Sequence, residues 1–238
     1  MSLTTQKASS PVGLYLEWKG THEDGRIQTW DKENEKNINY KKFQFIPFDT
    51  LYSVRGYNEA SKAGVRANEV KSVQSEDLEV YAGFKNRTPL VSGKWKDIKD
   101  AVRGHGGKFA ICAYGIGKLL NGETGTICVV FSGSGSGAWF DLQKSAGGSL
   151  EGKLITWDGS TNEGQKGSTK YDIPVLKASE PSDGELDKAK AADLEFQAYL
   201  KAQKASQGRP ADDLGDDPPE AYSTAVAANA TEDDDIPF

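Results

Sequence analysis

Short runs of alternating apolar and polar residues, separated by Gly-, Asn- and Asp-containing turns, occupy the chain as far as residue 178. Alternation with a period of two is typical of strands that bury one face. Many short strands rich in aromatic residues and glycine favour a closed or partly closed barrel over an open parallel sheet. We therefore expect a mainly β fold with strands at 12–18, 26–30, 37–48, 50–57, 65–72, 78–84, 108–116, 126–131, 153–157 and 171–177.

Two short helices are expected between these strands. Apolar residues at helical spacing predict one helix at about 93–103, and Trp139 with Leu142 predicts another at 138–145. Several large aromatics are expected in the core rather than at a binding site. They are Trp18, Phe43, Phe45, Phe48, Trp95, Trp139 and Trp157.

Charge divides the chain into a mildly basic part and an acidic arm. Residues 1–178 hold 24 Lys and Arg against 20 Asp and Glu, whereas residues 179–238 hold 5 against 15. The net charges of +4 and −10 give the −6 of the whole chain. A basic globular part with an acidic tail is a cue for interaction with nucleic acids. We predict three parts: a binding domain at 1–178, a helix within 179–205 and an acidic linker at 206–238.

The helix expected at about 183–205 is amphipathic. Its start resembles a capping box formed by Ser182 and Glu185. Apolar residues then recur every three or four positions, so this helix could pack on the barrel or form part of a homodimer contact. Gly208-Arg209-Pro210 ends the helix, and residues 206–231 are poor in hydrophobics. We expect the arm at 206–238 to be disordered.

Nothing in the sequence predicts a secreted or membrane-spanning protein. The first ten residues contain no apolar signal region, and no stretch approaches the 18 apolar residues of a membrane span. We expect a cytoplasmic protein in which Cys112 and Cys128 are buried reduced thiols, with a disulfide as the alternative. The scattered His22 and His105 do not predict a zinc site.

Two glycine-rich segments could indicate a nucleotide-binding enzyme. The run from Gly133 to Ala138, with Asp158 twenty residues later, matches a dinucleotide-binding fingerprint. Only one further strand follows the short helix, so a Ser/Gly loop is favoured, and its helix N-terminus could instead hold a DNA phosphate. Residues 104–108 lack the Walker pattern and predict a turn. We expect no enzyme and no cofactor.

Aromatics on the polar faces of strands give a stronger signal. Trp30, Tyr40, Tyr57 and Tyr81 alternate away from the apolar positions of their strands. Rings that stack on bases, with cations that track phosphates, suit single-stranded DNA binding without sequence preference. Tyrosine is also common on ordinary amphipathic strands, so this alternative stays open. The predicted DNA contacts are Arg26, Trp30, Tyr40, Lys42, Arg55, Tyr57, Lys62, Arg66, Tyr81 and Lys85.

The chain ends in three carboxylates followed by an Ile-Pro-Phe tripeptide. An aromatic side chain at the end of an acidic arm is suited to a hydrophobic pocket with a basic rim on a partner. The predicted partner-binding residues are Asp233, Asp234, Asp235, Ile236, Pro237 and Phe238.

This hexapeptide resembles the C-terminal tip of bacterial single-stranded DNA-binding proteins, which recruits replication and repair enzymes. The overall layout resembles a divergent single-stranded DNA-binding protein from a bacteriophage of enteric hosts. The resemblance implies an OB-fold-type five-stranded barrel, with extra hairpins and short helices, that coats single strands during phage replication or recombination. It also implies host or phage replication and repair proteins as partners of the tip, in the cytoplasm of an infected bacterium. The principal alternative is a protein-binding adaptor whose tip mimics the host protein.

Overall fold

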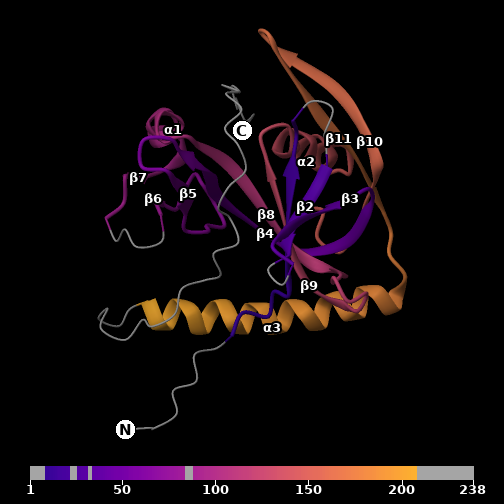
Figure 1. The fold of residues 1–238 in the computed structure, drawn as a ribbon. Helices are drawn as coiled ribbons and strands as arrows, with labels where there is room; N and C mark the ends of the chain where they lie inside the picture. Colours follow the sequence, from indigo (N-terminus) through magenta and orange to yellow (C-terminus); the bar gives the residue numbers. More distant parts are fainter. Residues whose placement is uncertain (1–8, 22–25, 32–33, 84–87, 208–238) are drawn as a thin grey trace, which may run out of the picture.

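The computed structural model describes residues 9–21, 26–31, 34–83 and 88–207. These residues form eleven strands and three helices (Figure 1). The mainly β prediction is confirmed.

One long strand, β4 (Phe43–Asn58), organises the sheet. It pairs antiparallel over most of its 16 residues with β8 (Gly107–Lys118). On the far side of β8 the order continues through β9 (Thr124–Ser132), β1 (Leu14–Lys19), β2 (Arg26–Asp31) and β3 (Lys36–Tyr40). The pairing of β1 with β9 is parallel, and the other pairings are antiparallel.

The other edge of β4 is shared between two sets of strands. Its first residues pair with β10 (Leu154–Lys166), which forms a long hairpin with β11 (Thr169–Ser179). Its last residues pair with β5 (Ala63–Ala67), which is followed by β6 (Leu78–Ala82) and β7 (Val91–Gly93). The β10–β11 hairpin projects beyond the remainder of the sheet (Figure 1).

The five-stranded OB-type barrel is not confirmed, because the sheet is open and has eleven strands. An isolated bridge joins Thr21, beyond β1, to Tyr171 of β11, and the Asp172 N–H donates to the Gly20 carbonyl at 3.0 Å. No strand pairing continues this contact within the described residues. Beyond its pairing with β10, β4 continues to Asn58, and its last residues give β5 an edge on which to pair.

The predicted strand at 37–48 is interrupted. Residues 41 and 42 form a bend between β3 and β4, and β4 then continues through the separately predicted run at 50–57. This bend changes the alternation between Tyr40 and Phe43, so side chains on its two sides cannot be assigned to faces by one period.

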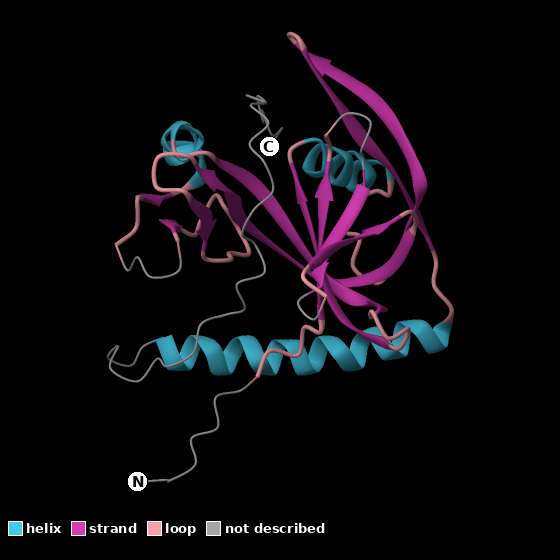
Figure 2. Ribbon diagram, viewed as in Figure 1, coloured by secondary structure: helices cyan, strands magenta, loops and turns pink. Residues whose placement is uncertain are grey.

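The main core lies on one face of the sheet, under two short helices. Helix α1 (Trp95–Gly104) packs against β7 and β8, and α2 (Ser134–Ser145) packs against β11 and β9 (Figure 2). The predicted core aromatics are at most 9% exposed, except Phe48, which is half-buried. These buried side chains are Trp18, Phe43, Phe45, Trp95, Trp139 and Trp157.

Helix α3 (Asp183–Gln207) packs on the opposite face of the central strands. Half of the predicted capping box is present, since Glu185 accepts hydrogen bonds from the Ser182 N–H at 3.0 Å and hydroxyl at 2.6 Å. These bonds hold the pKa of Glu185 below its usual value. The Glu185 N–H donates to the Ser182 carbonyl at 3.1 Å and not to the hydroxyl. Phe196 is buried among side chains of β4, β8 and β9. The helix therefore packs on its own sheet.

The glycine run that suggested a nucleotide loop forms the first turns of α2. Gly135 and Ser136 are buried, and a Cβ at Gly135 would lie 2.6 Å from Cδ1 of Trp18. The Trp18 indole N–H donates to the Ser134 hydroxyl at 3.1 Å, which itself donates to the Asp172 carbonyl at 2.6 Å. The small residues allow α2 to approach Trp18.

This packing predicts that Gly135→Ala lowers the free energy of unfolding by about 1–3 kcal/mol, because the added methyl overpacks the core. Gly137→Ala is the matched control, since it lies in the same helix and a Cβ there meets nothing within 4 Å. The control should be neutral or stabilising by up to about 1 kcal/mol. Denaturant unfolding of both variants measures the difference. Equal stability of the two variants would contradict the close approach of α2 to Trp18.

Candidate nucleic-acid interface

Three cations and a tyrosine lie in line across four neighbouring strands. Strand register places Lys108 of β8 opposite Arg55 of β4, Arg55 opposite Arg66 of β5, and Arg66 opposite Tyr81 of β6. We call these four residues the basic row. Directly paired positions have side chains on the same face, about 4.5–5.5 Å apart at Cβ. The row therefore crosses the strands with cations at three consecutive positions.

The basic row faces away from the core under α1. In each of the four strands, one residue adjacent in sequence to the row residue is at most 2% exposed. These buried neighbours are Val54, Val65, Val80 and Phe109. The four side chains of the row are half-buried. Alternation thus separates an apolar face, covered by α1, from an outer face that presents charge and one ring.

Arg55 is held in place by several acceptors. Its guanidinium donates to Ser53 Oγ at 3.3 Å, to the Val54 carbonyl at 3.4 Å and to Glu69 Oε1 at 3.2 Å. The guanidinium also lies 4.0 Å from Sγ of Cys112. A planar guanidinium bound at this many points is held in one orientation.

Carboxylates moderate the charge around the row. Glu69 forms an ion pair with Arg55, and the Tyr81 hydroxyl donates to Glu79 Oε2 at 2.6 Å. This hydrogen bond is the main reason that the pKa of Tyr81 is raised. The row is therefore a mixed surface with cations at its centre, rather than a uniformly basic patch.

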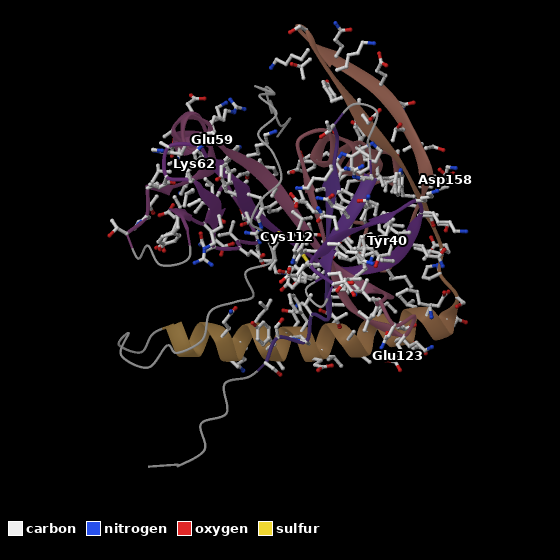
Figure 3. The ribbon with its side chains drawn as sticks, viewed as in Figure 1. Tyr40, Glu59, Lys62, Cys112, Glu123 and Asp158 are labelled. Atoms are coloured by element: carbon white, nitrogen blue, oxygen red, sulfur yellow. The ribbon has the colours of Figure 1, made fainter. Side chains whose placement is uncertain are left out.

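Two further predicted residues lie beside the row. Tyr57 is two positions beyond Arg55 on the same face of β4, opposite Gly64, and is half-buried. Lys62 lies in the turn between β4 and β5, where it is exposed and forms an ion pair with Glu59 at 2.8 Å. That interaction raises the pKa of Lys62. Figure 3 shows Lys62 and Glu59 together, at the end of the sheet where β5, β6 and β7 lie.

Arg26 and Trp30 lie on the same face of the sheet but in a separate group. Register leads from Leu51 of β4 across β8 and β9 to Glu17 of β1 and then to Gln28, between Arg26 and Trp30. The cluster covered by α3 lies on this face of β4, β8 and β9, between the two groups. The predicted contacts thus form two patches rather than one.

The assignment of Tyr40 to the polar face is wrong. Tyr40 pairs with the buried Ile27 and packs against the main core, and burial raises its pKa. The bend at residues 41–42 caused the error, because it separates Tyr40 from the alternation of β4. Lys42 lies in this bend and is exposed. Figure 3 shows Tyr40 far from Lys62.

Some predicted residues lie outside the described ranges. These are Lys85 and the six tip residues from Asp233 to Phe238. Their roles remain predictions.

Lys108 belongs to the basic row and was not predicted. It follows Gly107 and precedes the buried Phe109, so period-two alternation in 107–111 would have placed it on the polar face. The segment at 104–108 joins α1 to β8 as the predicted turn, and Asn58 Nδ2 donates to the His105 carbonyl at 3.1 Å.

The glycine run packs against the core, and its serine hydroxyls form internal hydrogen bonds. The α2 N-terminus lies against Trp18, and its first serine hydroxyls bond to Asp172 and Gly133 carbonyls. The largely antiparallel sheet also differs from the doubly wound parallel sheet that a dinucleotide fingerprint requires.

Cys112 and Cys128 are buried with free thiols, as predicted. A hydrogen bond between the two side chains and their burial raise the pKa of Cys112. Among the described residues, no group of three His, Cys, Asp or Glu side chains could hold a metal ion. None of the helices in the described ranges is long and apolar enough to cross a membrane.

The face assignments predict different effects for two aromatic substitutions. Tyr40→Ala should lower the free energy of unfolding by about 1–3 kcal/mol, because its ring packs on the core. Trp30→Ala should lower the free energy of unfolding by a smaller amount, although its ring is larger, because Trp30 lies on the outer face. Thermal unfolding of both variants tests this order. A larger loss for Trp30 would place that residue in the core.

No protein-family model, no curated protein and no solved structure matches this chain. Its binding chemistry therefore has to be inferred from its own side chains.

Proposed function

We propose that the protein binds single-stranded DNA, without base preference, along the outer face that carries the basic row. The observation that carries the proposal is the alignment of Lys108, Arg55 and Arg66 with the Tyr81 ring across four strands. Cations on one line can follow successive phosphates, and a ring at its end offers a base a stacking surface worth about 1–3 kcal/mol.

A row of side chains on a sheet face favours binding of single strands over recognition of base sequence in a duplex. Sequence reading in the major groove uses a helix or a two-stranded ribbon that reaches base edges. The row instead consists of half-buried side chains on a sheet face, bordered by Tyr57. In this proposal the part of the sheet formed by β1–β4 and β8–β11 acts as an OB-type platform, and β5 to β7 extend it.

The C-terminal tip gives the proposal its biological setting. Its resemblance to the tip of bacterial single-stranded DNA-binding proteins favours a role in phage DNA replication or recombination, in the cytoplasm of an infected bacterium. The tip would recruit replication or repair proteins, while the folded part holds the DNA.

The first prediction for this function concerns salt. Affinity for a dT oligomer should fall with salt, with log K changing by about −0.7 per phosphate neutralised. Arg66→Ala and Lys108→Ala should each weaken binding and make this slope shallower by up to about 0.7. Fluorescence titrations at several salt concentrations give both quantities.

Lys177→Ala is the matched control for these variants. It removes the same charge from β11, where Lys177 forms an ion pair with Asp158 at 2.7 Å. Its slope should equal that of the wild-type chain. A salt-independent affinity, or equal effects of all three substitutions, would contradict binding at the basic row.

The second prediction separates two roles of the arm. Removing residues 206–238 deletes 9 acidic residues and 1 basic residue, a charge change of +8. DNA affinity should rise, most clearly at low salt, because the arm no longer competes for the cations.

Deleting Phe238 alone should leave DNA affinity almost unchanged but abolish partner binding, because one aromatic anchor commonly dominates a short-peptide interface. The measurement compares the full chain and both deletions against oligo-dT and a host enzyme that binds the bacterial tip. Unchanged enzyme binding after loss of Phe238 would refute the recruiting role of the tip.

A further inference from the structure

A single carboxylate joins the basic row to the buried cluster under α3. Glu69 lies beyond the end of β5, and its Oε1 accepts from Arg55 at 3.2 Å. Its other oxygen, Oε2, accepts from the Tyr114 hydroxyl at 2.6 Å. The two oxygens of Glu69 therefore connect an outward-facing cation with a tyrosine of β8.

Tyr114 is well placed to act as an anchor. It is 4% exposed, and its ring stacks on Phe196 of α3 with centroids 4.3 Å apart. Burial is the main reason that the pKa of Tyr114 is raised. The hydroxyl therefore stays protonated at neutral pH and donates a hydrogen bond to Glu69. A single strand on the outer face cannot contact a ring covered in this way.

We propose that Glu69 is a positioning residue for DNA binding. Anchored by Tyr114, its carboxylate holds the Arg55 guanidinium in the direction that aligns it with Lys108 and Arg66. The proposal rests on the proposed function, because it specifies how one cation of the binding surface is oriented. It also adds Tyr114 and Glu69, which the sequence analysis did not single out.

A purely electrostatic role for Glu69 predicts a different result. If its charge only weakens the attraction of Arg55 for phosphate, the Tyr114 hydroxyl should be irrelevant to binding, or its loss should help. If Glu69 positions Arg55, loss of that hydroxyl should weaken DNA binding although the charge of the protein is unchanged. Tyr114→Phe therefore distinguishes the two roles.

The experiment measures oligo-dT affinity of full-length Tyr114→Phe at low salt. Loss of one anchoring hydrogen bond should weaken binding about threefold to tenfold. Tyr199→Phe is the matched control, because Tyr199 packs at the edge of the same cluster and its hydroxyl accepts from Gln203 at 3.3 Å. The control should bind as the wild-type chain does. Unchanged or tighter binding by Tyr114→Phe would overturn the proposal.

A double-mutant cycle tests whether the effect passes through Arg55. Tyr114→Phe should have no further effect in an Arg55→Ala chain and its full effect in an Arg66→Ala chain. The same loss in both backgrounds would mean that Tyr114→Phe acts through general destabilisation and would overturn the positioning role.

A readout without DNA keeps this proposal separable from the proposed function. The guanidinium N–H resonances of Arg55, assigned by their absence from Arg55→Ala, should shift in Tyr114→Phe and stay in place in Tyr199→Phe. If the wild-type chain fails to bind oligo-dT, the proposed function fails, and a shift shows only that Tyr114 and Glu69 orient Arg55. Unshifted resonances would overturn the positioning role whether or not DNA binds.

Discussion

The antiparallel pairing of β4 with β8 is the interaction on which the rest of the structure depends. Its paired positions run from Phe45 with Gly117 to Gly56 with Gly107, with one irregularity between Pro47 and Asp49. The first residues of β4 pair with β10 on its other edge, and the last residues pair with β5 on that same edge. Because both halves share one ladder, the core under α1 and the core beside α2 are continuous.

This shared ladder explains which parts of the fold could be predicted. Alternation within one uninterrupted strand assigned faces correctly, as for Val54 in the core and Arg55 and Tyr57 on the outer face. Alternation placed Tyr40 on the wrong face, because a two-residue bend at 41–42 interrupts the strand. This bend contains no glycine or proline that would have indicated it in the sequence. The sequence also did not predict that parts of the strands expected at 37–48 and 50–57 form the single strand β4, since the length of a strand depends on partners distant in sequence. Tertiary pairing, rather than local propensity, determines the break at residues 41–42 and the length of β4.

The candidate site illustrates the same limit. Sequence reasoning found Arg55, Arg66 and Tyr81 one strand at a time, but their alignment depends on the registers of three strand pairs. Lys108 was not predicted because the glycine-rich segment 104–108 was interpreted as a turn, whereas Gly107 and Lys108 begin β8. Trp30 was correctly judged to be on a polar face, yet the cluster under α3 separates it from the row. Period and charge indicate what faces outward, whereas topology decides which of those side chains meet.

Helix α3 limits how far any ligand can extend over the outer face. It covers the central strands β4, β8 and β9 through a cluster that includes Phe196, Cys112 and Tyr114. Under the proposed function, a DNA strand bound at the basic row would meet the cluster covered by α3 before it reached Trp30.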